Sequence, residues 1–108
     1  MINHLDLCSG IGGFALGFKW ANLSKTIAFC DFDKPCQKVL AKNFPNVPIF
    51  NDVKEIASDP RKFIQQPIGI LSGGYPCQPF STSGKRLGSE DPRHIFPYIH
   101  EIVKQIRP

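Results

Sequence analysis

Residues 68–81 read Ile-Gly-Ile-Leu-Ser-Gly-Gly-Tyr-Pro-Cys-Gln-Pro-Phe-Ser, an apolar run that leads through two glycines to a cysteine between two prolines. The apolar run at 68–71 predicts a buried parallel strand, and the glycines allow a sharp turn where it ends. Open α/β sheets bind ligands beyond the carboxyl ends of their strands, so we expect Cys77 at the mouth of a cleft. The prolines restrict the backbone beside the thiol, and Gln78 adds an amide that donates and accepts hydrogen bonds. This arrangement suits a nucleophile, but it also fits a turn in which Cys77 is a small buried side chain.

The composition is that of one small folded domain. The 108 residues are 42% hydrophobic and 20% charged, which is ordinary for a globular chain and excludes a disordered tail. A net charge of +4 fits a polyanionic partner without requiring one. The four cysteines show neither zinc-ligand pairing nor the density of a secreted disulfide scaffold, so we expect reduced thiols in a cytoplasmic protein. The sequence shows no signal peptide and no apolar run of transmembrane length, so we expect neither export nor membrane insertion.

The start of the chain predicts a strand, a glycine turn and a helix. Residues 5–8 form the short strand, after which the apolar period becomes that of a helix running to about Trp20. Between them Gly10, Gly12 and Ala15 match the pattern G-x-G-x-x-G/A, whose glycines permit a tight turn and close approach of a ligand to the backbone. Alone, the pattern fits either nucleotide binding or a glycine-rich connector.

An acidic residue follows the next predicted strand, residues 26–30. Asp31 lies 19 residues after the second glycine of the pattern, where nucleotide-binding folds of this kind place the acid that binds ribose hydroxyls. The glycines and the acid together favour nucleotide binding. Phe32 fits a side chain that stacks on adenine and one that covers the end of the sheet equally well. Asp33 is predicted to be the N-cap of a helix that ends before Pro45. The apolar stripe of that helix is Cys36, Val39, Leu40 and Phe44.

A third short strand, residues 48–50, precedes Asp52. With Glu55 this aspartate fits a capping box, and it also fits a carboxylate that accepts from an adenine amino group. One or two short helices should follow, up to residue 66. The last predicted element is an amphipathic helix that begins at about His94 or later. Its apolar face consists of Ile95, Ile99, Ile102, Val103 and Ile106.

Residues 81–93 carry hydroxyls, glycines and three basic side chains but almost nothing apolar. Hydroxyl, Lys and Arg side chains are the groups that contact nucleic-acid phosphates, and a long stretch without structure of its own is often a functional loop. The stretch therefore fits a mobile loop over nucleic acid as well as an ordinary solvated loop. With the neighbouring glutamine, the candidate DNA contacts are Gln78, Ser81, Ser83, Lys85, Arg86 and Arg93.

Together these motifs resemble those of the DNA (cytosine-5)-methyltransferase family. The matching segments, in order and at similar spacing, are residues 6–14, 30–33, 51–53, 74–81 and 84–88. They correspond to the first four motifs of the family's catalytic domain and cover nearly the whole chain. The Pro-Cys-Gln element after a strand is highly specific for this family. Two positions depart from the pattern, because the family usually has Phe where this chain has Cys8 and an acid where it has Gly69.

The resemblance implies transfer of a methyl group from S-adenosylmethionine to carbon 5 of a cytosine flipped out of duplex DNA, leaving S-adenosylhomocysteine. Asp31 would hold the ribose, Phe32 and Val53 the two faces of the adenine, and Asp52 its amino group. Cys77 would add to carbon 6 of the cytosine, which makes carbon 5 reactive enough to accept the methyl group. No metal is implied. The implied cofactor-binding residues are Leu7, Cys8, Ser9, Gly10, Ile11, Gly12, Gly13, Phe14, Asp31, Phe32, Asp52, Val53, Gly74 and Pro76.

The fold implied by the resemblance is α/β with three layers, the N-terminal half of a Rossmann-like methyltransferase domain with four parallel strands in the order 3-2-1-4. The family's later Glu-Asn-Val strand and target-recognition domain are not in the sequence. We therefore expect a fragment or a split subunit of a bacterial or phage restriction-modification enzyme, inactive alone. The strand at 68–71 would be an unprotected sheet edge, which predicts self-association or a complementary C-terminal fragment as a partner beside double-stranded DNA.

Two other functions fit parts of the sequence. A non-catalytic remnant that binds cofactor or serves a structural role would account for the absent Glu strand. An NAD-binding Rossmann module shares the glycines and Asp31, but it gives no reason for the Pro-Cys-Gln element.

Overall fold

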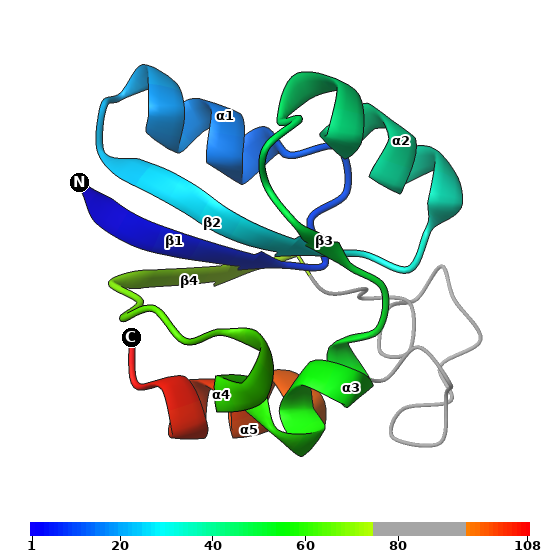
Figure 1. Cartoon of the computed structure of the whole chain (residues 1–108), viewed down its shortest axis with the longest axis vertical. Helices are drawn as coiled ribbons and strands as arrows, with labels where there is room; N and C mark the ends of the chain where they lie inside the picture. Colours follow the sequence, from blue (N-terminus) through cyan, green and yellow to red (C-terminus); the bar gives the residue numbers. More distant parts are fainter. Residues whose placement is uncertain (75–94) are drawn as a thin grey trace, which may run out of the picture.

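The structure, a computed structural model, describes residues 1–74 and 95–108. In chain order its elements are β1 (Ile2–Leu7), α1 (Gly13–Trp20), β2 (Ser24–Cys30), α2 (Lys34–Asn43), β3 (Ile49–Phe50), α3 (Val53–Ser58), α4 (Pro60–Phe63), β4 (Ile70–Gly73) and α5 (Phe96–Ile106). The strands form one parallel sheet in the order β3-β2-β1-β4, which confirms the predicted fold. Figure 1 shows the three layers, with α1 and α2 on one face of the sheet and α3, α4 and α5 on the other.

The central strand β1 presents different side chains to the two helical layers. Leu5 and Leu7 are fully buried and pack in one core with Ile102 of α5. His4 points to the opposite face, where its ring meets Phe18 of α1 edge to face. Because successive side chains of a strand alternate, Asp6 lies on the same face as His4. The sheet is therefore apolar towards α5 and partly polar towards α1.

Close packing of α1 against α2 explains the second glycine of the turn. A Cβ atom on Gly12 would lie 3.0 Å from Leu40 Cδ2 and 3.1 Å from a ring carbon of Phe44, and its φ is +90°. Ala15 is buried beside Leu40 in the same small cluster as Phe29. Small residues at these positions let the two helices approach each other and the sheet.

The predicted strand before Cys77 was displaced by two residues. The expected strand was 68–71, whereas β4 runs from Ile70 to Gly73. Gly69, just before β4, already lies against β1, because its N–H donates to Asn3 O at 3.0 Å and a Cβ there would lie 2.3 Å from Ile2 Cγ2. The chain stays in the sheet beyond the apolar run because Ser72 pairs with Asp6 of β1, a polar pair that hydrophobicity does not predict.

The other elements agree with the predictions apart from their ends. β1 begins at Ile2 rather than residue 5 because its first residues pair with β2 from Ser24, and it ends before Cys8, whose φ of +53° is outside the strand region. In α5, Val103 is 39% exposed and is not part of the buried face, and Val39 is similarly exposed on α2. Within the described residues, no helix is long and apolar enough to cross a membrane.

Candidate functional site

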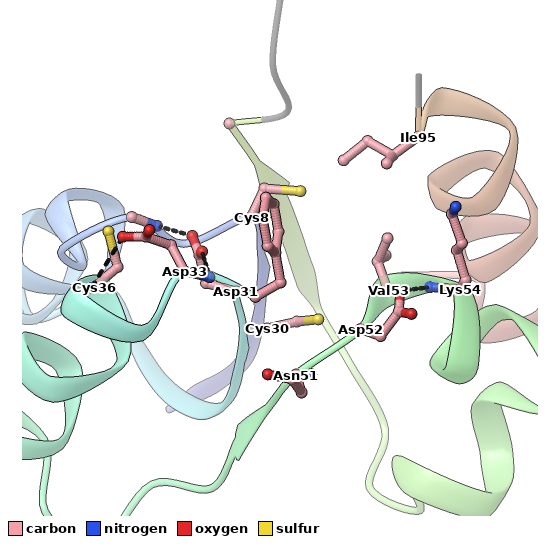
Figure 2. A pocket seen from close by; sticks show the side chains of 13 residues that line it. Cys8, Cys30, Asp31, Asp33, Cys36, Asn51, Asp52, Val53, Lys54 and Ile95 are labelled. Atoms are coloured by element: carbon pink, nitrogen blue, oxygen red, sulfur yellow. Dashed lines mark hydrogen bonds between the residues drawn. The ribbon is translucent and has the colours of Figure 1, made fainter. Parts of the chain in front are cut away.

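The carboxyl ends of the strands open into a pocket of about 600 Å³ (Figure 2), a size typical of small-molecule sites. Segments that follow all four strands contribute to its lining, together with the start of α3 and the residue before α5. The lining residues are Cys8, Gly10, Cys30, Asp31, Phe32, Asp33, Cys36, Asn51, Asp52, Val53, Lys54, Gly74 and Ile95. This is the edge of an open α/β sheet at which ligands are expected.

Asp31, just after β2, joins the turns that follow β1 and β2. Its Oδ2 accepts a hydrogen bond from Gly10 N–H at 2.8 Å, and its Oδ1 accepts one from Asp33 N–H at 2.9 Å. Gly10 has a φ of +59°, a conformation that glycine adopts without strain. Each carboxylate oxygen keeps a second lone pair, so Asp31 can still accept hydrogen bonds from hydroxyl groups of a ligand. The glycine turn and the acid, which together favoured nucleotide binding in the sequence, are joined by a hydrogen bond in the structure.

Two helices begin at the pocket, and each is capped by an aspartate. Asp33 Oδ2 accepts from Cys36 N–H at 3.2 Å at the start of α2, and Asp52 Oδ1 accepts from Lys54 N–H at 2.9 Å at the start of α3. Both N-cap predictions are confirmed. Asp52 is exposed, so its remaining lone pairs are open to a ligand as well.

The pocket also has an apolar lining. Phe32 extends from the end of β2 with 72% of its surface exposed, whereas Val53 at the start of α3 is 7% exposed. Figure 2 shows Val53 and Lys54 on the opposite side of the pocket from Asp31 and Asp33. A flat ring placed between these sides would have apolar contacts and a carboxylate within reach.

Three free cysteines line the pocket, and the pKa of each thiol is raised. Burial is the main cause that raises the pKa of Cys8 and of Cys30 to about 12, and a hydrogen bond to Asp33 raises the pKa of Cys36 to about 11. A raised pKa favours the protonated thiol at neutral pH, whereas the thiolate is the nucleophilic form. Among the described residues, no group of three or more metal-binding side chains occurs.

The pocket gathers about half of the predicted cofactor-binding residues. Those on its lining are Cys8, Gly10, Asp31, Phe32, Asp52, Val53 and Gly74. Leu7 is buried in the core, and Ser9 Oγ donates to Asp6 O at 2.8 Å and accepts from Cys30 N–H at 3.3 Å. Phe14 is exposed on α1 and stacks on Phe18. Also away from the lining are Ile11, Gly12 and Gly13.

The predicted nucleophile Cys77 lies outside the described residues. The other predicted site residues outside them are Pro76, Gln78, Ser81, Ser83, Lys85, Arg86 and Arg93. Gly74, the last described residue before this segment, lines the pocket.

The sequence did not single out several lining residues. Asn51 Oδ1 accepts from Lys34 Nζ at 3.1 Å and from Gln37 Nε2 at 2.9 Å, which ties α2 to the end of β3. Lys54 Nζ lies 5.4 Å from the centre of the Tyr98 ring, which ties α3 to α5. Asn51 and Lys54 lie within two residues of Asp52 in the sequence, and this position could have predicted them as lining residues. The position of Ile95 depends on how α5 packs, for which the local sequence holds no signal.

Family comparison agrees with this geometry. The family model described as C-5 cytosine-specific DNA methylase matches residues 2–108. The chain belongs to this family.

The methylase chain is similar to curated bacterial enzymes over almost all of its length. It is 40% identical over 109 residues to the Type II methyltransferase M.Sau96I of Staphylococcus aureus, covering 98% of this chain and 25% of that protein. It is also 40% identical to the Type II methyltransferase M.NgoBI of Neisseria gonorrhoeae, covering 100% of this chain and 32% of that protein. The chain thus spans about a quarter to a third of the length of these relatives.

The structural comparison shows the methyltransferase fold. The crystal structure of the S. pombe Dnmt2 methyltransferase matches with a TM-score of 0.74 and 22% identity, covering 100% of this methylase chain and 33% of that one. The three-layer arrangement around the parallel sheet is therefore shared at low sequence identity.

Proposed function

We propose that this chain is the N-terminal, cofactor-binding part of a DNA cytosine-5 methyltransferase and carries its nucleophile. The observation that carries the proposal is the pocket itself, in which Asp31, Phe32 and Asp52 lie on one lining with Gly74. Gly74 is three residues before Cys77 in the sequence. A nucleoside site beside the segment that bears a cysteine is the arrangement that methyl transfer to a base requires.

The pocket residues fit S-adenosylmethionine. The ribose hydroxyls would donate to the free lone pairs of Asp31, and the adenine would lie between Phe32 and Val53 with its amino group on Asp52. The glycine turn from Gly10 would receive the methionine half. S-adenosylmethionine supplies an electrophilic methyl group when bound. The three-carboxylate lining suits its positive charge better than it would suit a phosphate.

Cys77 provides the covalent step on the substrate. Its thiolate forms a bond to carbon 6 of the cytosine, and the electron pair of the 5,6 double bond makes carbon 5 nucleophilic towards the methyl group. Loss of the proton from carbon 5 then expels the thiolate and restores the double bond. Carbon 6 is hidden in a stacked duplex, so the cytosine must be flipped out. The candidate DNA contacts in residues 78–93 are proposed to hold the strand during this step.

The partners follow from the sheet. Within the described residues β4 is the last strand and pairs on one side only, with β1. An unprotected strand edge is a template for another strand. We propose that its partner is a strand of a complementary C-terminal segment, or of a second copy, and that the substrate is double-stranded DNA. A cytoplasmic restriction-modification system of a bacterium or phage is the proposed setting, supported by the bacterial Type II relatives.

Calorimetry on the 108-residue chain tests the proposal. We expect measurable binding of S-adenosylhomocysteine and of S-adenosylmethionine, and no comparable binding of NAD. Tight NAD binding with no binding of either adenosyl compound would reject the proposed function. The non-catalytic remnant predicts the same binding, and it is separated from the enzyme by covalent trapping of a fluorinated duplex in the complete protein.

A further inference from the structure

A buried polar chain crosses the sheet on its α1 face and does not contribute to the pocket lining. Thr26 Oγ1 lies 2.7 Å from His4 Nδ1, His4 Nε2 lies 2.6 Å from Ser72 Oγ, and Ser72 Oγ donates to Asp6 Oδ1 at 2.8 Å. His4 and Asp6 are fully buried on β1, between Thr26 of β2 and Ser72 of β4. The ring of Phe18 covers the imidazole at a centroid distance of 5.0 Å. The chain thus connects three neighbouring strands beneath α1.

While Asp6 is ionised, every hydrogen bond of this polar chain is donated in the direction of the Asp6 carboxylate. A carboxylate only accepts, so the Ser72 hydroxyl hydrogen is committed to Asp6 Oδ1. Ser72 Oγ is then the acceptor towards His4, which must carry its proton on Nε2. His4 Nδ1 is left as an acceptor and takes the hydroxyl hydrogen of Thr26. Burial lowers the pKa of His4, which favours the neutral imidazole of this arrangement.

Protonation of Asp6 allows every bond in the polar chain to reverse. One proton is taken up from solvent, and Asp6 Oδ1–H then donates to Ser72 Oγ. The Ser72 hydroxyl turns to His4 Nε2, and the single imidazole proton sits on Nδ1, where it donates to Thr26 Oγ1. Each group keeps its partner, so the chain is stable in both directions.

The surroundings of Asp6 place this reversal in an accessible pH range. Burial, with a smaller effect of the Asp31 carboxylate, raises the pKa of Asp6 to about 6 against the opposing hydrogen bond of Ser72. Asp6 Oδ2 is buried without a hydrogen-bond partner among the described residues, which costs more for a carboxylate than for a neutral acid. The other titratable neighbours are His4 on β1 and Cys8 after it, and β2 carries the exposed Lys25 and the buried Cys30. β4 carries none, and α1 carries only the exposed Lys19.

We propose that His4 and Ser72 are positioning residues for the strand that leads to Cys77. Ser72 lies two residues before Gly74, whose N–H donates to Leu7 O at 3.3 Å. In the described part of the chain β4 is held by β1 alone, so the bonds of Ser72 fix the carboxyl end of a strand that has no second neighbour. The link to Cys77 rests on the proposed function. The hydrogen-bonded polar chain and the reversal of its bonds rest on the geometry of its four side chains.

The tautomer of His4 is the first test, because a purely structural role does not predict it. Long-range 1H–15N spectra of the imidazole, recorded on the 108-residue chain without cofactor or DNA, distinguish Nε2–H from Nδ1–H. Substitution of the other two histidines, His94→Gln and His100→Gln, leaves His4 as the remaining histidine signal. We expect a neutral ring with the proton on Nε2 at pH 8 and on Nδ1 at pH 5. A charged ring or an Nδ1–H tautomer at pH 8 would overturn the proposal.

Substitutions in β4 test the positioning. Ser72→Ala should abolish the pH-dependent tautomer change and should speed amide hydrogen exchange at Gly74 several-fold, and Ser72→Thr should restore both. Leu71→Ala is the matched control, because Leu71 is on the opposite face of β4 and packs against the α5 core. It should lower stability and leave the tautomer change intact. A tautomer change that survives Ser72→Ala, or unchanged exchange at Gly74, would contradict the proposal. These readouts need no ligand, so a chain that failed to bind S-adenosylhomocysteine would reject the proposed function alone.

Discussion

Replacement of Asp31 by alanine separates ligand binding from folding in the pocket. The carboxylate accepts two backbone hydrogen bonds, 2.8 Å from Gly10 and 2.9 Å from Asp33, and is proposed to accept further bonds from the ribose. A hydrogen bond to a charged group contributes about 1.5–3 kcal/mol. We therefore expect Asp31→Ala to weaken S-adenosylhomocysteine binding about 10- to 150-fold. Because Asp31 is partly exposed, we expect the free energy of unfolding to fall by only about 1–2 kcal/mol.

Asp33→Ala is the matched control for this experiment. It also removes one carboxylate from the pocket lining, but that carboxylate caps α2 by accepting from Cys36 N–H. Loss of an N-cap costs about 1 kcal/mol of stability. The two variants should therefore have similar stability, and the Asp33 variant should bind S-adenosylhomocysteine within a few-fold of the wild type.

The assay is titration calorimetry at a temperature at which both variants are folded, with urea denaturation to measure stability. Equal affinities in the Asp31 and Asp33 variants would refute the assignment of Asp31 to the ribose, because both lose the same charge from the same pocket. A loss of binding that matched only the loss of stability would refute it too.

Three further predictions concern other parts of the molecule. Asp6 has a pKa raised to about 6, so its ionisation destabilises the fold above that pH and the penalty disappears as the pH falls towards 4. The free energy of unfolding of Asp6→Asn minus that of the wild type should consequently increase by about 3 kcal/mol from pH 4 to pH 8. Urea denaturation measures this difference, and a constant difference would contradict the raised pKa. Ile102→Ala should cost about 2–5 kcal/mol because the side chain is fully buried, whereas Val103→Ala on the exposed side should cost less than about 1 kcal/mol, and equal losses would contradict the packing of α5. In the complete enzyme Cys77→Ser should abolish methyl transfer with cofactor binding intact, and the wild type should trap a duplex that carries 5-fluorocytosine; an active enzyme that left this duplex free would exclude Cys77 as the nucleophile.

Features set by neighbouring residues were predictable from the sequence. Asp33 and Asp52 cap α2 and α3 as expected, because an N-cap needs only an aspartate and the backbone N–H groups two or three residues later. The turn at Gly10 was equally local. The strand order came from the resemblance to the family, since a pattern of apolar residues does not say which strands are neighbours.

Features set by strand register were not predictable. The bond from Gly10 N–H to Asp31 joins residues 21 apart, and that from His4 to Ser72 joins residues 68 apart. The sequence predicted no role for either His4 or Ser72. Only the pairing of β4 with β1, opposite Asp6, gives either residue a role.

The charge of the pocket distinguishes the two nucleotide ligands that its glycine turn alone would fit. Asp31, Asp33 and Asp52 place three carboxylates on the lining, and in the described part of the chain Lys54 is the one basic residue there. Two unit charges about 6 Å apart interact by about 3 kcal/mol at an effective dielectric constant of 20. A pyrophosphate at such distances would meet that repulsion from more than one carboxylate. A sulfonium would meet attraction of similar size. The charge of the lining therefore supports the proposed S-adenosylmethionine over a dinucleotide.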